Sequence, residues 1–238
     1  RSAGVVAELN VKNGDAVVTG QVLARLEDNL QAEADFLSLF SAQGLAQAEL
    51  AVVTAQDTLD DSINDLKYVI GSDAYYWEVQ LKQAEETLTA LAVDSTASAE
   101  QKAEAQKVVD RARLNRDYFQ QQNIDYLVAE EDVYVDESDI ALAHSNFETA
   151  KVFLLDAQTA LEIVKAGSEA LTDSIAALGT QTAKLEQARL AVENSRLIAP
   201  FDGSIIAPNV VTAQQVGTSP AITFSRSRST ASPTGTTK

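Results

Sequence analysis

The sequence predicts an α+β protein in which a long antiparallel α-helical coiled-coil hairpin is inserted between two halves of a small β-sandwich. A motif of alternating apolar and polar residues at positions 4–11 recurs at positions 203–210. The same alignment pairs Val17 with Val216. The residues between the two motifs carry apolar side chains at heptad spacing. Each half-motif is too small to bury its own apolar face, so we expect the halves to pack as one β module.

The first half of the β module is predicted to span residues 1–28. Its three strands are expected at residues 5–11, 17–18 and 22–26, where apolar and polar residues alternate. Gly14 and Gly20 lie in the two tight turns between them, where a positive φ is easily adopted by glycine. Asp28 or Asn29 is expected to cap the helix that follows, because a short polar side chain can accept from amides of the first turn.

The second half of the module is predicted to span residues 196–224. It opens with the motif formed by Ala199, Pro200, Phe201, Asp202 and Gly203. The prolines of this half stand where a strand begins or a corner turns, so the missing amide does little harm. We interpret the five residues of the motif as structural.

Residues 29–195 are predicted to be helical throughout, with a heptad rhythm. The outgoing series is Leu45, Val52, Leu59 and Leu66; the returning series is Phe147, Leu154 and Leu161, and it resumes as Leu171, Leu178, Leu185 and Val192. The resumed series starts ten residues after Leu161, which is one heptad plus three residues and is the spacing of a stammer in a coiled coil. Large residues on one seam and alanines on the other favour close antiparallel packing.

Breaks divide this helical region. Gly71 ends the first helix, and the residues at 94–97 end the second. Ser98 and Gln101 have the spacing of a capping box that starts a third helix. The outgoing limb is longer than the returning one, so an extra helical layer is expected near 71–97, anchored by Trp77. The distal turn is expected near 127–137, where the helical period is lost.

The composition argues against most catalytic and nucleic-acid-binding functions. The chain of 238 residues has a net charge of −17, which would repel nucleic-acid phosphates. It has no cysteine and one histidine, so thiolate metal sites and histidine-based metal sites or triads are not expected. Adjacent acids such as Asp60 and Asp61 do not face each other on a helix. We expect no enzyme activity, no metal site and no small-molecule substrate.

Residues 4–28 and 196–205 resemble the two halves of the lipoyl-like (biotinyl-lipoyl) domain of membrane-fusion, or periplasmic adaptor, proteins of the haemolysin-D type. The order of half-motif, helical hairpin and half-motif covers residues 4–224. The resemblance implies a subunit that links an inner-membrane export pump, of the ABC or RND type, to an outer conduit component. It also implies several copies around a transport path and a location in the cell envelope, outside the cytoplasm.

The family usually continues into a β-barrel and a membrane-proximal domain, whereas residues 225–238 here are polar and low in complexity. We expect this tail to be disordered. The strand pattern begins almost at residue 1, so a membrane anchor is expected in a segment that precedes this chain.

A lipoyl-like fold also raises the possibility of a cofactor carrier. A carrier needs a lysine at the tip of a tight hairpin between the two half-motifs, and here residues 29–195 replace that hairpin. Lys12 lies in a different turn and Lys184 on a predicted helix. No cofactor is therefore expected.

The distal turn is the candidate partner-binding site. Apolar residues gather there among acids: Tyr126, Leu127, Val133, Tyr134 and Val135. An apolar patch rimmed by charge is the usual form of a protein contact site. Two alternatives stay open at this point. The five residues could instead pack on one another to seal the turn, and the whole chain could be a structural coiled-coil scaffold without a transport partner.

Overall fold

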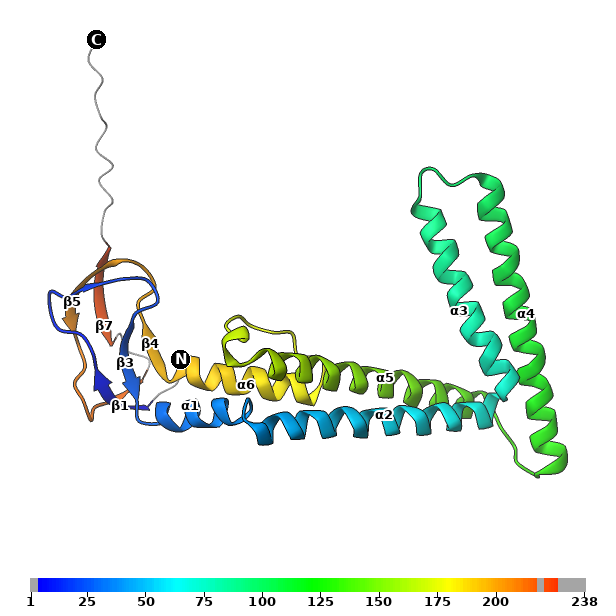
Figure 1. Cartoon of the computed structure of the whole chain (residues 1–238), viewed down its shortest axis with the longest axis horizontal. Coiled ribbons are helices and arrows are strands. Elements are labelled where there is room, and N and C mark those ends of the chain that lie inside the picture. The colour runs from blue at the N-terminus through cyan, green and yellow to red at the C-terminus, as the bar shows by residue number, and fades with distance from the viewer. Residues whose placement is uncertain (1–3, 218–220, 227–238) are drawn as a thin grey trace, which may run out of the picture. The chain divides into compact units, whose positions relative to one another are not determined.

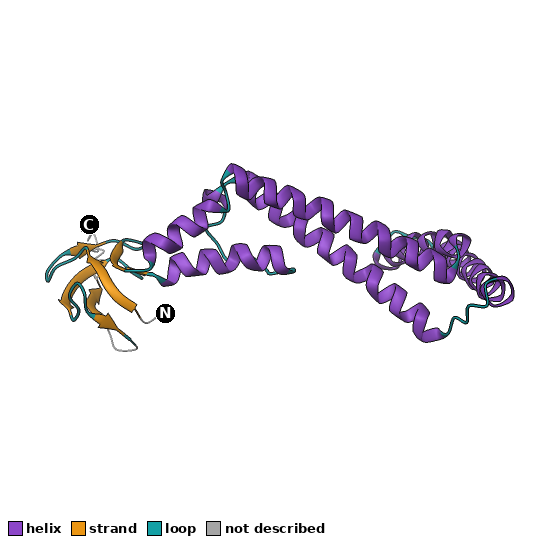
Figure 2. Cartoon of the chain, turned by 90° about the horizontal axis from the view of Figure 1, so that it is seen from below, coloured by secondary structure: helices purple, strands orange, loops and turns teal. Residues whose placement is uncertain are grey.

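The computed structural model describes residues 4–217 and 221–226, and the chain has the predicted α+β fold (Figure 1). It divides into two compact units. The first unit comprises residues 1–49 and 159–238, and the second comprises residues 50–158. All the described strands belong to the first unit, and the second consists of helices and loops (Figure 2).

The β module has seven described strands in two antiparallel sheets. They are β1 (Gly4–Leu9), β2 (Ala16–Val17), β3 (Val22–Leu26), β4 (Arg196–Ile198), β5 (Gly203–Pro208), β6 (Gln215–Val216) and β7 (Ile222–Arg226). One sheet has the order β4-β3-β1-β6 and the other β2-β5-β7. Each sheet therefore combines strands from both ends of the chain. Strand β7 includes Ser225 and Arg226, which corrects the predicted start of the tail; residues 227–238 lie outside the described part.

The strands from the two ends share one apolar core. Its buried members are Val11, Val17, Leu23, Ala199, Ile205 and Ile222. A second cluster, of Val6, Ala24 and Val210, again takes residues from both halves. Leu23 and Ile222, which the sequence repeat aligns, are both buried in the first of these clusters. The predicted joint packing of the two half-motifs is confirmed.

Two helices flank the β module in the first unit. They are α1 (Asn29–Ser38) and α6 (Thr180–Asn194). The predicted cap role of Asp28 or Asn29 is wrong. Asp28 makes no side-chain capping bond, and the buried Asn29 donates through Nδ2 to Ser195 Oγ at 2.8 Å. This hydrogen bond joins the start of α1 to the end of α6.

The long helices α2 (Ala42–Ile70) and α5 (Glu137–Ala166) carry the predicted heptads. The prediction that the returning limb stays helical up to residue 195 is wrong, however. Residues 167–179 contain only a short 3-10 helix, η1 (Ser168–Ala170). Gly167 ends α5 with a φ of 91°, which favours glycine. Leu171 is buried against Leu185 in a cluster of the first unit. The heptad spacing of Leu171 therefore does not reflect a helix.

The second unit contains the additional helical layer. It consists of α3 (Ser72–Val93) and α4 (Ala99–Glu130), which pack along each other. Leu81 and Ala84 of α3 are buried against Val109 and Ala112 of α4, with Trp77 packed beside them. The capping box at the start of α4 is confirmed, because Ser98 Oγ accepts from the Gln101 amide and Gln101 Oε1 accepts from the Ser98 amide.

Candidate functional site

The predicted structural motif joins the two halves of the β module. Asp202 Oδ1 accepts hydrogen bonds from the backbone amide of Thr19 at 2.7 Å and from its hydroxyl at 2.8 Å. Both hydrogen bonds hold the pKa of Asp202 below its usual value, and the bond from the amide has the larger effect. A Cβ on Gly203 would collide with the carbonyl oxygen of Ser225. Glycine at this position therefore allows β5 and β7 to lie close together.

The remaining motif residues support the same contact. Gly14 and Gly20 have φ values of 91° and 83°, as the predicted turns require. The Gly20 amide donates to the carbonyl of Ala199, which is buried. The ring of Phe201 lies 5.8 Å from that of Phe224, and Pro200 is exposed. All these contacts lie inside the β module, so the motif positions backbone and contributes no reactive group.

The candidate partner-binding residues divide into buried and exposed members. Tyr126 and Leu127 are on α4, and Val133, Tyr134 and Val135 are in the loop of residues 131–136. Leu127 and Val135 are buried, and Val133 is half-buried. Tyr126 is 53% exposed and Tyr134 is 81% exposed. The two tyrosines are thus the members that a partner could reach.

Hydrogen bonds at both ends hold the loop of residues 131–136. At its start, the Glu131 and Val133 amides donate to the carbonyl of Leu127 at 3.2 and 3.0 Å. At its end, Asp136 Oδ1 accepts from the amides of Ser138 and Asp139, and Asp139 Oδ2 accepts from the Asp136 amide. Hydrogen bonds from Ser138 and Asp139, above all from the Ser138 hydroxyl, lower the pKa of Asp136. The loop thus has defined ends.

The junction between α2 and α3 is stabilised by a residue that the sequence did not single out. Asn123 of α4 donates through Nδ2 to the carbonyls of Tyr68 and Val69, at 3.0 Å each. These carbonyls lie in the last turn of α2, where no intrahelical donor is available. Gly71 follows with a φ of 92°, and a Cβ there would lie 2.8 Å from Asn123 Cβ. Tyr68 also donates through its hydroxyl to Glu131, at 3.0 Å.

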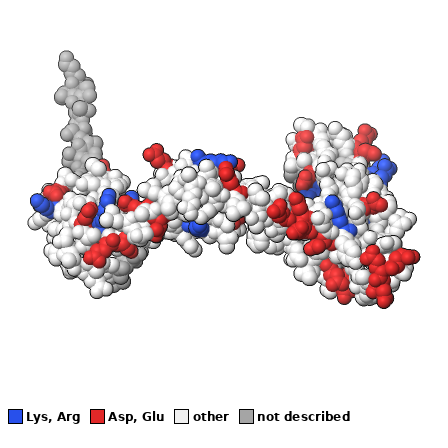
Figure 3. Space-filling view, turned by 60° about the horizontal axis from the view of Figure 1, so that its bottom comes forward, with Lys and Arg blue, Asp and Glu red and all other residues white. Residues whose placement is uncertain are grey.

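The only histidine of the chain lies in a polar cluster between helices of the second unit. His144 Nδ1 of α5 is 3.3 Å from Glu78 Oε1 of α3. Desolvation raises the pKa of Glu78, and the charges of His144 and of Arg116 on α4 oppose this shift. Figure 3 shows clusters of acidic side chains on the surface of the second unit. The cluster thus connects α3, α4 and α5 through charged side chains.

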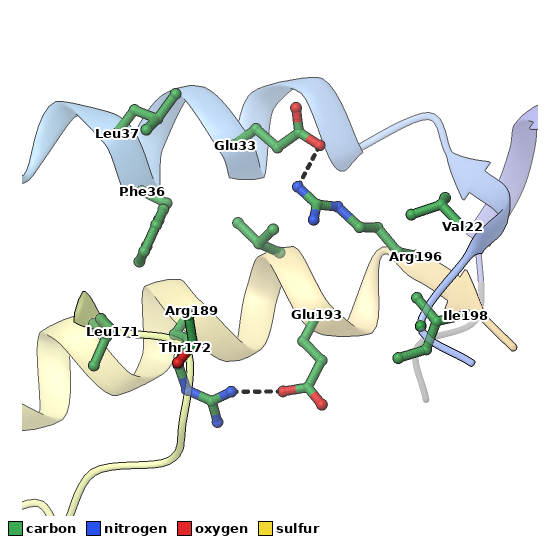
Figure 4. A pocket seen from close by; sticks show the side chains of 12 residues that line it. Val22, Glu33, Phe36, Leu37, Leu171, Thr172, Arg189, Glu193, Arg196 and Ile198 are labelled. Carbon is green, nitrogen blue, oxygen red and sulfur yellow. Dashed lines mark hydrogen bonds and ion pairs between the residues drawn. The ribbon is translucent and has the colours of Figure 1, made fainter. Parts of the chain in front are cut away.

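A pocket of about 500 Å³ lies in the first unit between α1, α6 and strands β3 and β4 (Figure 4). Its apolar wall consists of Val22, Phe36, Leu37, Leu171, Val192 and Ile198. Glu33, Arg189, Glu193 and Arg196 supply its charged groups. Arg196 donates to Glu33 at 2.6 Å, and Arg189 donates to Glu193 at 2.8 Å. The sequence did not indicate this pocket, because its residues come from both ends of the chain.

Residues 1–224 match the model of a protein family described as "CzcB-like, barrel-sandwich hybrid domain". The chain belongs to this family. The two interleaved halves of the β module are its barrel-sandwich hybrid domain, and the resemblance to membrane-fusion, or periplasmic adaptor, proteins is confirmed. No curated protein matches the sequence at a significant level.

Solved structures similar to this barrel-sandwich hybrid protein have low sequence identity. A protein described as an efflux transporter from Bacteroides eggerthii is 12% identical, with a TM-score of 0.31 and coverage of 96% of this chain and 38% of its own. The periplasmic adaptor protein EmrA is 17% identical, with a TM-score of 0.28 and coverage of 93% and 68%. The soluble domain of LipC, a membrane fusion protein of a type I secretion system, is 16% identical, with a TM-score of 0.28 and coverage of 92% and 94%.

Two further properties of the barrel-sandwich hybrid protein concern ligands and membranes. Among its described residues, no group of three or more His, Cys, Asp or Glu side chains is placed to hold a metal ion. Within residues 4–217 and 221–226, no single helix is long and apolar enough to cross a membrane. The pair formed by α1 and α2, with a bend of 54° between the two helices, is long and apolar enough when the two are taken together.

Proposed function

We propose that this protein is a non-catalytic adaptor subunit of an export or efflux system. In this role it links a membrane pump, of the ABC or RND type, to an outer conduit component. The observation that carries the proposal is the family match over residues 1–224, together with a β module built from both ends of the chain. A coiled-coil scaffold without a transport partner has no evident need for such a module.

The β module suits an adaptor because it ties both ends of the helical region to one place. The start of α1 and the end of α6 meet through the Asn29–Ser195 hydrogen bond. Both ends also adjoin the same sheet, since α1 follows β3 and α6 precedes β4, and these two strands are paired. We place the protein in the cell envelope, outside the cytoplasm, with several copies around a transport path.

The loop of residues 131–136 and the end of α4 are the contact surface that we assign to the outer component. Tyr134 is the main candidate, because it is exposed, whereas Leu127 of α4 and Val135 of the loop are buried. Acidic residues flank it in the sequence, including Glu131 and Asp132. An exposed aromatic ring held on an anchored loop loses little conformational entropy when it binds a partner.

The adaptor role is tested by export measurements in the native host. Removal of the gene should abolish export of the system's substrate, and the wild-type gene should restore it. Tyr134→Ser should reduce export and reduce crosslinking between the loop and an outer-membrane component, with unchanged helicity and melting temperature. Tyr118→Ser is the matched control, since Tyr118 is also an exposed tyrosine of the second unit.

The outcomes separate the adaptor from the scaffold. Unchanged export after gene removal would contradict the adaptor role as a whole. Export lost on gene removal but fully retained by Tyr134→Ser would leave the adaptor role standing and refute the assigned contact surface. A loss of helicity in Tyr134→Ser would show that the residue seals the loop instead.

A further inference from the structure

Two arginines lie side by side next to the pocket of the first unit. Arg25 of β3 and Arg196 of β4 are direct partners in the antiparallel register. Both approach the same oxygen, Glu33 Oε1, at 4.0 Å for Arg25 Nη1 and 2.6 Å for Arg196 Nη2. Like charges placed opposite each other in a sheet are destabilising. One carboxylate between two permanently charged guanidinium groups leaves an excess of one positive charge.

Both arginines also have donors that no acceptor uses. Within the described residues, the Nε atoms of Arg25 and Arg196 are buried and have no hydrogen-bond partner. Buried donors are almost always paired, because an unpaired one loses its hydration without compensation. The two side chains are nevertheless about a third exposed, at 34% and 32%, so an acidic group can reach the guanidinium groups and balance the excess charge.

The other charged groups of the pocket are already compensated. Arg189 donates to Glu186 and Glu193, which leaves this second cluster with an excess negative charge. Glu186, however, also accepts from the Ser174 hydroxyl at 2.9 Å and the Ile175 amide at 3.2 Å. Glu186 therefore has donors in addition to Arg189, whereas Arg25 and Arg196 share Glu33 as the single acidic partner that the described residues supply. This difference favours an anion as the missing partner.

The pocket beside Arg196 has a wall of apolar side chains, which a hydrocarbon chain could contact. Val22 and Ile198 line it next to the strands, and Phe36, Leu37, Leu171 and Val192 line it next to the helices (Figure 4). A volume of about 500 Å³ lies within the usual range of ligand pockets. The side chain of Arg196 extends from β4 towards α1 and forms part of the lining.

We propose that this pocket binds an anionic amphiphile. Its single acidic group, a carboxylate or a phosphate, lies on Arg25 and Arg196, and its hydrocarbon chain lies along the apolar wall. The acidic group accepts from the free guanidinium donors, and burial of the chain supplies the rest of the affinity. This site is independent of the proposed adaptor role.

Calorimetric titration of the full chain with single-chain probes tests the proposal. Hexanoate, octanoate and decanoate, each below its micellar concentration, should bind with affinity that rises by up to about fourfold per added methylene. Decyl phosphate tests the phosphate arm, and inorganic phosphate tests the acidic group alone. Decyl maltoside, which is uncharged, is the ligand control. The stronger of decanoate and decyl phosphate identifies the source of the acidic group.

Three variants connect binding to the named residues. Arg25→Gln and Arg196→Gln should each weaken decanoate binding by about tenfold or more, since each removes a charged donor. Ile198→Trp, at an exposed position of the wall, should abolish the dependence on chain length while keeping both arginines. Arg113→Gln is the matched control, because it makes the same change in net charge at an arginine paired with Glu85.

The results that would overturn the proposal are equally specific. They are an absence of binding by every charged probe, equal binding of decyl maltoside, or binding of inorganic phosphate as tight as that of decyl phosphate. Equal weakening by Arg113→Gln would also overturn it. Circular dichroism of each variant shows whether it is folded, and if one arginine variant is not, the other arginine variant and Ile198→Trp still decide the question.

Discussion

Single residues in this protein are stabilised by partners that are often far away in the sequence. Asp202 accepts from Thr19, Asn29 donates to Ser195, and both pairs join the two ends of the chain. The motif of residues 199–203 was recognisable from its composition, but the partner of Asp202 was not. Asn123 was missed altogether, because a lone asparagine within a helical pattern carries no local signal of a capping role.

Acid should weaken the first unit through Glu186. The hydrogen bond from Arg189 is the main cause that lowers the pKa of Glu186 to about 2, from an ordinary value of 4.5. A group with a depressed folded-state pKa contributes stability above its unfolded pKa and loses it as the pH falls. The contribution of Glu186 should therefore be complete above pH 4.5 and be lost as the pH falls towards 2.

Urea unfolding measured between pH 2 and 6 checks this prediction. In wild type the free energy of unfolding should decline with falling pH more steeply than in Glu186→Gln. The comparison is needed because Asp94, Asp136 and Asp202 also have lowered pKa values and titrate in both proteins. Parallel pH profiles for the two proteins would contradict the assigned role of the Glu186–Arg189 pair.

Most helices and strands form where the local sequence pattern predicts them. The exception is a segment in which heptad spacing continues by chance beyond the end of a helix. Leu171 and Leu178 continue a heptad spacing, yet residues 167–179 are not helical apart from a short 3-10 turn. Gly167 and Gly71 both end long helices with a positive φ. At Gly71 the next helix, α3, begins at the following residue. There Asn123 of the neighbouring α4 limits the space for a side chain at position 71.

Substitution of Gly71 should cost more than substitution of Gly167. The φ values are nearly equal, 92° and 91°, so alanine at either site carries a similar backbone penalty of about 1–3 kcal/mol. At Gly71 the new Cβ would also meet Asn123 Cβ at 2.8 Å, whereas nothing lies within 4 Å at Gly167. Gly71→Ala should therefore lose about 1–3 kcal/mol more stability than Gly167→Ala. Chemical denaturation compares the two, and equal losses would show that α4 moves away freely.

The molecule as a whole depends on pairing between chain ends that are separated by the entire helical region. Strand β1 pairs with β6, β2 with β5, and β3 with β4. The core side chains of the module also come from both ends. Each half has one strand pair of its own, β1 with β3 and β5 with β7, but both complete sheets and both core clusters need residues from the other half. The two halves should therefore fold together.

Removal of β5, β6 and β7 should therefore unfold the first half. In a chain that ends at Asp202, the amides of β1 and β3 should lose their protection against hydrogen exchange, because β1 loses β6 and the shared core loses Ile205 and Ile222. A chain that ends at Arg226 keeps every described strand and serves as the control. Unchanged protection of Val5 and Val6 after the longer truncation would refute the joint folding of the two halves.

Local sequence patterns were enough to predict the α+β class, the two strand-forming halves and most of the helices. These features depend on backbone preferences, turn chemistry and the period of apolar residues, all of which act over a few neighbours along the chain. The sequence repeat added the packing of the two ends, because neither half could bury its apolar face alone.

Contacts between distant residues were decided by the tertiary structure alone. The opposition of Arg25 and Arg196 depends on the register of β3 and β4, and the capping of α2 by Asn123 depends on where α4 crosses the junction. The burial of Leu127 and the exposure of Tyr134, both from one apolar group in the sequence, are likewise a product of packing. The energies of these contacts arise only once separate elements meet, and no short-range pattern in the sequence records which elements will do so.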